Sequence, residues 1–318
     1  MKVHDIQYPT QMPSHCDQGY SLAIGFFDGL HRGHQQLIQE AVSQAKRSKT
    51  RAAVMTFDPH PSVVLSGKKT DIHYITPLKQ KLELLRDMDV DDVFVVRFTS
   101  DFARLSPETF MDEFILKLNV HHVIAGFDFS FGAFGKGDME HMTSYLAGQV
   151  QVMTIPKFTL EEDKVSSTRI RKELTEGNVD NVRDLLGRPF QLDGIVVHGD
   201  KRGRTIQFPT ANIATDEEQY IPANGVYAVR MFVQNKWVDG VCNVGYKPTV
   251  QDIKKLSIEV HLFDFDHDIY GEQVRVLWYA PIRKEQKFPS LDALKQQIQR
   301  DKEQAIALLG SLSLPERP

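Results

Sequence analysis

The chain of 318 residues is poor in several features that would place a protein in a special class. Its two cysteines, Cys16 and Cys242, are far apart and in no metal-ligand pattern, which is typical of a reducing compartment. No apolar run approaches the roughly 18 residues of a membrane-spanning helix, and the N-terminal residues lack a signal-peptide pattern. A net charge of −4 gives no basic excess, which argues against nucleic acid or an anionic membrane as partner. We therefore expect a cytoplasmic protein.

Among the features that are present, the segment 25–34, GFFDGLHRGH, is the most informative. It lies between an apolar, strand-like run and a run with helical spacing. A helix that begins here presents unpaired backbone N–H groups and the positive end of its dipole, which together favour a bound anion. Gly33 lets a phosphate approach the backbone, and His31 and His34 add donors. Half a zinc site with His60 is a weak alternative, because no Cys or carboxylate is at ligand spacing nearby. The strand–helix position also argues against an incidental polar turn.

A second motif, VSSTRIR at 165–171, opens a helix that we expect to run to about Glu176. Ser167 and Thr168 are suitable capping residues. Capping does not explain two arginines in the first turns, because the helix dipole disfavours cations there. A bound phosphate would remove the conflict, so Arg171 is a candidate phosphate ligand. Together the two motifs resemble the nucleotidyltransferase superfamily, which transfers a nucleotidyl group from ATP or CTP to a phosphate.

The first half of the chain alternates between strand-like and helical segments. Strands are predicted at 22–27, 52–57, 93–98, 121–125 and 150–155, and helices at 35–46, 77–88, 107–118 and 139–146. This order predicts βαβ units and a parallel sheet with helices on both faces. Ligands of such sheets bind at the carboxyl ends of the strands, where the loops containing His31, 58–61 and 127–137 would converge.

The pattern changes after Leu186. Short β-rich runs follow at 190–198, 225–233, 236–243, 256–265 and 273–279. Their spacing predicts an antiparallel barrel or sandwich. A last helix is expected over 290–309, with a buried stripe at Leu291, Leu294, Ile298, Ala305 and Leu308. We place the domain boundary between residues 186 and 187.

The second half carries chemistry of its own. The loop 198–204, HGDKRGR, fits either a phosphate cradle or a solvated basic hairpin. Thr210 and Asn212 offer neutral oxygens, which suit a Mg²⁺ ion shared with nucleotide phosphates. Glu259 lies in an alternating, apolar strand, where it is either solvated or a working carboxylate. The pattern alone favours the solvated interpretation.

Over nearly its whole length the chain is similar to the prokaryotic bifunctional FAD synthetases, which join riboflavin kinase to FMN adenylyltransferase. The motifs that carry this resemblance are GFFDGLHRGH, FDPHP, GFDFSFG and VSSTRIR, followed by LLGRPF, GIVVHGDKRGR, FPTAN, NVGYKPT and IEVHLFDFDHDIYGE. The resemblance implies an α/β, Rossmann-like nucleotidyltransferase domain over 1–186 and an antiparallel β-barrel riboflavin kinase domain with a C-terminal helix over 187–318. It further implies that riboflavin is phosphorylated to FMN with ATP. FMN is then adenylylated to FAD with a second ATP, pyrophosphate is released, and Mg²⁺ is the cofactor.

The resemblance also implies roles for single residues. In the first half, the catalytic residues would be His31, His34 and Arg171, the ATP-binding residues Gly25, Phe27, Gly33, Ser167 and Thr168, and the flavin-binding residues Phe57, Asp128, Phe129 and Phe131. In the second half, ATP would bind at Gly199, Lys201, Gly203, Thr210 and Asn212, Mg²⁺ at Thr210 and Asn212, and flavin near Arg283, with Glu259 as the catalytic base. For Glu259 the resemblance therefore favours a working carboxylate, whereas the strand pattern alone favours a solvated one. The aromatic residues of 127–134 have strand core as an alternative role. Gln207 departs from the family, which normally has Gly there.

Two other functions fit part of the pattern. One is a nucleotidyltransferase with another acceptor, such as a pantetheine or choline phosphate, but the β-rich half with FPTAN and Glu259 argues against it. The other is a non-catalytic flavin-binding regulator, which would have lost catalytic residues that this chain retains.

Overall fold

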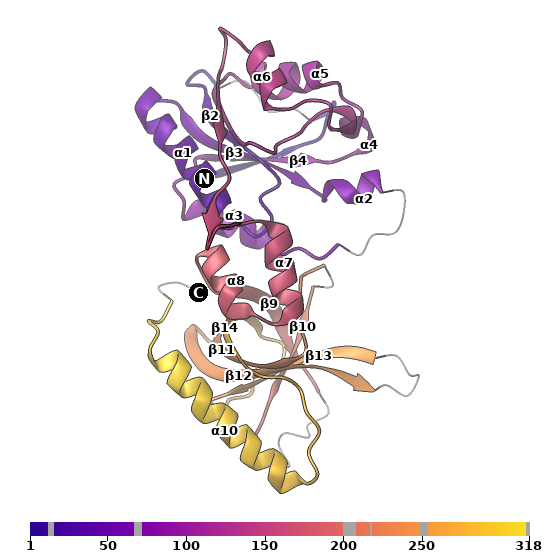
Figure 1. Cartoon of the computed structure of the whole chain (residues 1–318), viewed down its shortest axis with the longest axis vertical. Coiled ribbons are helices and arrows are strands. Elements are labelled where there is room, and N and C mark those ends of the chain that lie inside the picture. Colours follow the sequence, from indigo (N-terminus) through magenta and orange to yellow (C-terminus); the bar gives the residue numbers. More distant parts are fainter. Residues whose placement is uncertain (12–15, 67–71, 200–207, 217, 249–253, 316–318) are drawn as a thin grey trace. The chain divides into compact units, whose positions relative to one another are not determined.

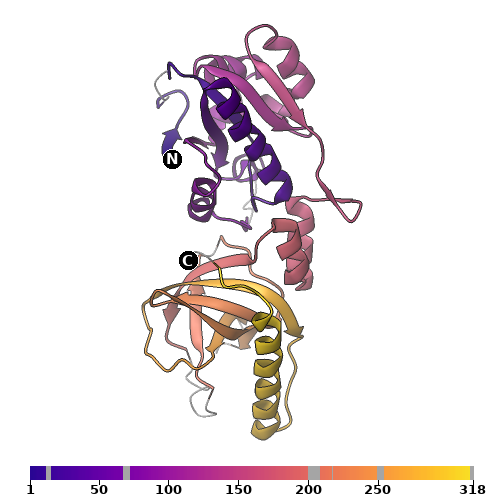
Figure 2. The same ribbon diagram turned by 90° about the vertical axis from the view of Figure 1, so that its left-hand side faces the viewer.

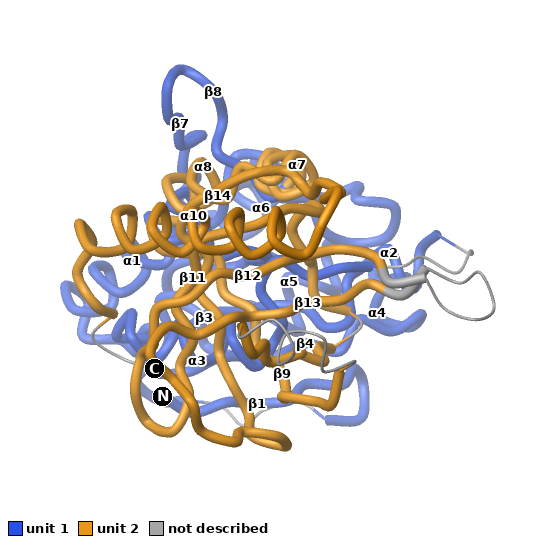
Figure 3. The backbone as a smooth tube through the Cα atoms, turned by 90° about the horizontal axis from the view of Figure 1, so that it is seen from below, with its two compact units in different colours: residues 1–167 blue, residues 168–318 orange. Residues whose placement is uncertain are grey.

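The computed structural model describes residues 1–11, 16–66, 72–199, 208–216, 218–248 and 254–315. The chain divides into two compact units, Met1–Ser167 and Thr168–Pro318 (Figure 3). The second unit therefore includes most of α7 (Ser167–Glu176) and all of α8 (Val179–Leu186), a helix that the sequence pattern did not indicate. Helix α8 packs against two strands of the second unit, so its apolar face belongs to that core. This division falls earlier in the chain than the boundary expected from the sequence.

The first unit is built on a six-stranded sheet in the order β1-β4-β3-β2-β5-β6, in which every pair is parallel (Figure 1). The strands are β1 (Lys2–Ile6), β2 (Tyr20–Ile24), β3 (Arg51–Asp58), β4 (Asp92–Arg97), β5 (Val120–Gly126) and β6 (Gln151–Ile155). The predicted parallel sheet is confirmed. The edge strand β1 was not expected, because its sequence KVHDI is largely polar and only Ile6 is buried.

Helices cover both faces of the sheet (Figure 2). One core joins α1 (Arg32–Ser48) and α3 (Leu78–Arg86) to the sheet through Ala23, Val54 and Val93. The other joins it, through alternate strand residues such as Leu22 and Ile24, to α5 (Pro107–Met111), a π-helical turn (Asp112–Leu116) and α6 (Met139–Tyr145). The helix expected over 107–118 is therefore interrupted. Shorter elements are α2 (Pro61–Leu65), α4 (Ser100–Ala103), a 3₁₀ turn (Ala133–Gly135) and the hairpin of β7 (Thr159–Leu160) and β8 (Asp163–Lys164).

The order of the strands fixes where this unit can bind a ligand. Strand β2 has β3 on one side and β5 on the other, so the direction in which the chain winds changes at β2. In open parallel sheets, such a switch point leaves a crevice outside the carboxyl ends of the strands. The loops after β2 and after β5 flank this position.

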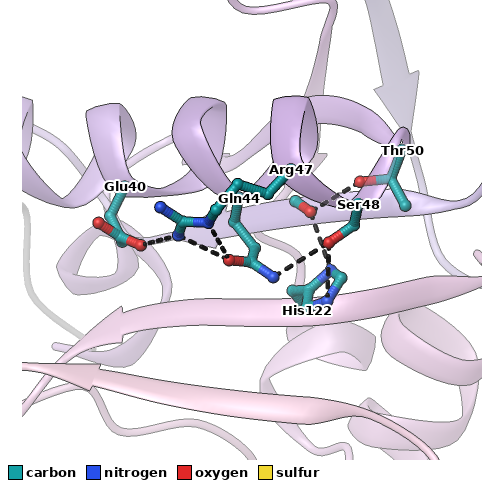
Figure 4. A network of polar contacts seen from close by, with 7 residues as sticks. Glu40, Gln44, Arg47, Ser48, Thr50 and His122 are labelled. Carbon is teal, nitrogen blue, oxygen red and sulfur yellow. Dashed lines mark hydrogen bonds and ion pairs between the residues drawn. The ribbon is translucent and has the colours of Figure 1, made fainter.

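The opposite, amino edge of the sheet carries a polar network that joins the end of α1 to β5 (Figure 4). The Arg47 guanidinium donates to Glu40 at 2.6 Å and to Gln44 at 2.7 Å. Gln44 in turn donates to the Ser48 hydroxyl at 3.1 Å, and this hydroxyl lies 3.4 Å from Nε2 of His122. Burial is the main cause that lowers the pKa of His122 and so favours its neutral form. This network anchors α1 on the edge remote from the crevice.

The second unit contains a closed barrel in the order β10-β13-β12-β11-β14-β9, which confirms a barrel rather than a sandwich. All its pairs are antiparallel. The strands are β9 (Phe190–Val197), β10 (Ala211–Thr215), β11 (Gly225–Val233), β12 (Lys236–Pro248), β13 (Lys254–Leu262) and β14 (Gln273–Arg283). Strand β10 was not expected and contains the end of the FPTAN motif.

Helix α10 (Leu291–Gly310) lies along the barrel wall (Figure 2). Its N-cap is Ser290, as typical capping chemistry favours. The expected apolar stripe is wrong at its start, because Leu291 is 66% exposed. The fully buried positions are instead Asp301, Ala305 and Leu309, one helical turn apart. Charged side chains of the barrel determine which face of α10 packs against it.

Those charged side chains are two arginines. Arg230 of β11 is buried, donates to the carbonyl oxygens of Leu309 and Leu312 at 2.8 and 3.0 Å, and pairs with Asp239 at 2.8 Å. It thereby satisfies helix-terminal carbonyls that would otherwise lack donors. Arg283, at the end of β14, grips the Asp301 carboxylate through Nε at 3.0 Å and a second nitrogen at 2.8 Å.

Candidate active sites

The turn that precedes α1 has an unusual backbone. Phe27, Gly29 and Leu30 have φ angles of 56°, 83° and 43°, in the left-handed region that residues other than glycine seldom adopt. Such conformations cost on the order of 1–3 kcal/mol each and persist where surrounding contacts fix them. The turn delivers the chain to His31, the N-cap of α1, and so it sets the direction in which both histidines point.

Hydrogen bonds from separate segments hold this turn. The buried Asp28 carboxylate accepts from the backbone N–H groups of Ile75 and Thr76 at 3.3 and 3.0 Å. The carbonyl of Asp28 accepts from the Ser167 hydroxyl at 2.8 Å, which brings the first residue of α7 to the turn. Asp28 is therefore a structural carboxylate of the GFFDG segment.

The two histidines of the motif lie face to face. The rings of His31 and His34 are stacked, with centroids 3.5 Å apart, and the Phe27 ring meets His34 edge-on at 5.3 Å. Nδ1 of His31 accepts the backbone N–H of His34 at 3.3 Å. In the neutral ring this places the proton on Nε2, which is then a hydrogen-bond donor.

His34 is held neutral by its surroundings. Burial, and after it the neighbouring His31, holds the pKa of His34 well below the usual range. Its Nδ1 is buried and has no hydrogen-bond partner within the part of the chain that the structure describes. A buried polar atom of this kind points to a missing partner. A phosphate at the N-terminus of α1 would supply one.

The glycines of the motif are close-packed. Gly25 directly follows β2, and a Cβ there would lie 2.8 Å from the Phe27 ring. A Cβ on Gly33 would lie 3.3 Å from Cβ of Phe158. The two glycines and Phe27, predicted as ATP-binding residues, are thus gathered around the histidines, with Phe27 acting as a buried support.

The residues predicted to bind flavin separate into two groups. Phe57 and Phe131 are 8% and 6% exposed and belong to the hydrophobic core, a role that was an expected alternative for Phe131 but not for Phe57. Phe129 is half-buried and stacks on Phe131 at 5.8 Å. Asp128 lies in the exposed loop after β5 and pairs with Lys164 of β8 at 2.5 Å. Asp128 and Phe129 therefore retain surface with which a flavin could interact.

Thr168 and Arg171 are the remaining residues predicted for this chemistry. Both lie on α7, as the expected helix start at VSSTRIR requires, and both are part of the second compact unit. Their roles stay predictions.

A second polar cluster lies on the barrel, around Glu259 of β13. Its carboxylate accepts from the Thr210 hydroxyl at 3.2 Å and from the Ser257 hydroxyl at 3.1 Å. Asn212 of β10 and Asn243 of β12 stand opposite Glu259 in the register of the two neighbouring strands. Glu259 is half-buried and hydrogen-bonded, so the solvated interpretation of the strand pattern does not describe it.

Two glycines mark close approaches beside this cluster. A Cβ on Gly199 would lie 2.2 Å from Nδ2 of Asn212, so a larger residue would displace the Asn212 side chain. A Cβ on Gly245 would lie 2.3 Å from Oε1 of Glu285 in the loop after β14. The predicted ATP residues Gly199, Thr210 and Asn212 therefore meet in one place. Lys201, Gly203 and Gln207 lie outside the described residues.

A pocket adjoins this cluster. It begins at Thr210 and is lined by Val196, Leu262, Phe265, His267 and Tyr270. Arg283, predicted to lie near the flavin, directs its guanidinium to Asp301 and to the Phe288 ring at 5.5 Å. It holds the start of the loop 284–290, and its contact with flavin stays a prediction.

Comparison with known proteins identifies the family of this chain. A FAD synthetase family model matches residues 14–169, and a riboflavin kinase family model matches residues 186–309. Proteins named bifunctional riboflavin kinase/FMN adenylyltransferase from Listeria monocytogenes and Bacillus subtilis are 43% and 42% identical, over 98% of this chain and 99% of theirs. The protein of that name from Escherichia coli is 39% identical over 97% of each chain. The chain belongs to the bifunctional riboflavin kinase/FMN adenylyltransferase family.

A solved structure also has a fold similar to that of this chain. A crystal structure described as a macrolide-efflux protein from Streptococcus pneumoniae matches with a TM-score of 0.88 and 34% identity, over 95% of this chain and 98% of the other. Among the described residues, no helix has the length and apolarity to cross a membrane. The two family models leave residues 170–185 between them, which include most of α7 and of α8.

Several residues of the two sites were not found from the sequence. Ser257 and Glu285 lie beside Glu259 or its neighbours, but no motif marks them, and Asn243 begins the NVGYKPT motif without having been assigned a role. Asp28 lies inside a motif, although its role is structural. A buried lysine of α3, Lys81, carries no sequence signal, because lysines of amphipathic helices are usually exposed.

Proposed function

We infer that this chain phosphorylates riboflavin to FMN with ATP in its barrel unit, and adenylylates FMN to FAD with a second ATP in its parallel-sheet unit. Pyrophosphate is released in the second reaction. This function is supported by the family of the chain and by the two matching domain models. It is also supported by the two polar clusters, one around His31 and His34 and one around Glu259.

In the kinase reaction, Glu259 acts as the general base. It takes the proton from the ribityl 5′-hydroxyl of riboflavin, and the oxygen attacks the γ-phosphate of ATP, so that ADP leaves. An alcohol is a poor nucleophile at neutral pH, which makes a positioned carboxylate useful. The hydroxyls of Thr210 and Ser257 orient this carboxylate. Positioning and neutralisation of charge supply most of the remaining acceleration.

Thr210 and Asn212 fit a Mg²⁺ ion that is shared with ATP. Their hydroxyl and amide oxygens are the hard, neutral ligands that Mg²⁺ accepts alongside phosphate oxygens. The lack of a side chain at Gly199 lets its backbone lie directly against the Asn212 amide. When bound, Mg²⁺ would neutralise charge on the transferred phosphoryl group.

Adenylyl transfer needs no strong base, because the phosphate of FMN is already ionised when it attacks the α-phosphate of ATP. His31 and His34 instead donate to the negative charge that accumulates on the α-phosphate and the leaving pyrophosphate. The two imidazoles at the N-terminus of α1, together with its backbone N–H groups, suit this task. Asp128 and Phe129 are proposed to contact the flavin.

We also propose that the protein works in the cytoplasm, where its cysteines, Cys16 and Cys242, would stay reduced. Neither forms a disulfide in the described structure.

The observation that carries the function best is the convergence of Glu259, Thr210, Asn212 and Gly199 on one edge of the barrel. The test is to incubate the full chain with riboflavin and MgATP and to separate the flavins by chromatography. We expect FMN to appear first and FAD to follow, with one pyrophosphate for each FAD. Riboflavin that stays unchanged would indicate a binding protein. Adenylylation of 4′-phosphopantetheine or phosphocholine in place of FMN would indicate another nucleotidyltransferase.

A further inference from the structure

Lys81 of α3 is buried beside the first candidate site. It is 2% exposed, although lysine is rarely buried without partners. Its Nζ donates to the carbonyl oxygen of Phe26 at 2.8 Å and to the Thr56 hydroxyl at 3.2 Å. The same Nζ lies 4.7 Å from the centroid of the Phe26 ring, within the range of a cation–π interaction.

The Phe26 carbonyl is the last one before the left-handed turn. It accepts from Lys81 and also from the Thr56 hydroxyl at 2.9 Å. Two donors on a single carbonyl fix the peptide plane from which the strained turn starts. Because the turn ends at His31, the position of this plane is transmitted to the imidazoles over a few residues.

The charged and titratable groups around Lys81 come from each element that faces it. Asp28 belongs to the turn, Asp58 to the end of β3, and His34 to α1. Burial lowers the pKa of Lys81 to about 8, against the opposing effect of the two carboxylates. The charge of Lys81 is in turn one of the causes that lower the pKa of His34.

We propose that Lys81 is a positioning residue for adenylyl transfer: its buried ammonium donates to the Phe26 carbonyl and so fixes the turn that leads to His31 and His34. This inference rests on the proposed function of the first unit and adds a residue that need not touch either substrate.

The direct test uses Lys81→Met in the full chain, because methionine keeps the apolar stem and removes the charge and the donors. The matched control is Lys79→Met, an exposed lysine on the same helix. We expect Lys81→Met to lower kcat for FAD formation from FMN about 10- to 100-fold, the scale of a misplaced catalytic group. FMN formation from riboflavin should stay within about twofold of the wild type in both variants, and the control should keep both activities.

Two further measurements distinguish this role from simple support of the fold. Below about pH 8 Lys81 is protonated, so we expect kcat for FAD formation to fall as the pH rises through about 8 and this decrease to be absent in Lys81→Met. The titration of His34, followed by NMR of its imidazole, should move to higher pH in Lys81→Met. A residue that only supports the fold would lower the melting temperature without moving either midpoint.

The proposal is overturned if Lys81→Met keeps more than about a third of kcat for FAD formation, or if the alkaline decrease and the His34 titration are unchanged. Should Lys81→Met not fold, Thr56→Val removes the other donor to the Phe26 carbonyl and an acceptor of Lys81. A selective, several-fold loss of FAD formation in Thr56→Val supports the proposal, and wild-type activity overturns it. If the wild type itself formed no FAD, the proposed function would fail, which is a separate result.

Discussion

Replacing Glu259 by Gln tests the division of labour between the two reactions. Glutamine has nearly the same size and can still accept the Thr210 hydroxyl, now 3.2 Å from the carboxylate. The amide nitrogen cannot accept from Ser257, but the Ser257 hydroxyl can rotate and become the acceptor. The local geometry therefore survives, and the main loss is the ability to take a proton from the substrate hydroxyl.

The size of the effect follows from this single loss. Removal of a general base costs about 100- to 10,000-fold in rate, which corresponds to roughly 3–5 kcal/mol in the barrier. Because the FMN phosphate is already ionised, the adenylyl transfer should be unaffected. One purified preparation of Glu259→Gln should thus convert supplied FMN to FAD at the wild-type rate while it produces almost no FMN from riboflavin.

The assay measures steady-state FMN formation and FAD formation separately, by chromatography of the flavins. Glu303→Gln is the matched control, since it makes the same chemical change on an exposed position of α10. A Glu259→Gln protein with more than about a tenth of the kinase rate would refute the assignment of the base, because that loss is below the usual range. Glu285, which reaches toward Gly245, would then be the next carboxylate to test.

Three further changes test other parts of the structure. His31→Asn keeps a good N-cap for α1 but removes the imidazole donor, so FAD formation should fall about 100- to 1,000-fold with FMN formation intact; equal loss of both activities would contradict this. Gly199→Ala places a Cβ 2.2 Å from Asn212 and should impair only FMN formation, measured as a higher KM for ATP; a normal kinase would contradict the proposed ATP loop. A fragment of residues 168–318 should fold and make FMN but no FAD, and it should melt at a higher temperature than 187–318, which lacks the buried face of α8. Equal melting temperatures would show that α8 is not part of the kinase core.

The fold could be predicted wherever burial produces continuous or periodic apolar patterns. Strands β2, β3 and β4 are nearly all buried, and their sequences are correspondingly apolar. Strand β1 was not predicted, because it is an edge strand with a largely polar sequence and one buried residue. The buried face of α10 was predicted wrongly for another reason. Arg283 binds Asp301, and Arg230 binds carbonyl oxygens at the C-terminal end of the helix. The periodicity of apolar residues does not reveal such polar contacts.

The sites could be predicted only in part. The spacing of His31 and His34 at a strand–helix junction was enough to place them together. Glu259 was not recognisable from its strand pattern, because a carboxylate among apolar residues has the same pattern whether it is solvated or hydrogen-bonded. Pattern also could not tell that Phe57 is core while Phe129 keeps exposed surface, since this depends on packing between distant segments.

The two sites differ in the use they make of carboxylates, and the difference follows the chemistry of their nucleophiles. In the barrel, hydroxyl groups orient Glu259 and leave it able to receive a proton. In the parallel-sheet unit, the carboxylate nearest to the histidines in sequence, Asp28, accepts backbone N–H groups of residues 75 and 76 instead. An additional negative charge directed at the phosphates there would oppose the attack of one anion on another. The buried ammonium of Lys81 beside the same turn has the opposite, favourable sign.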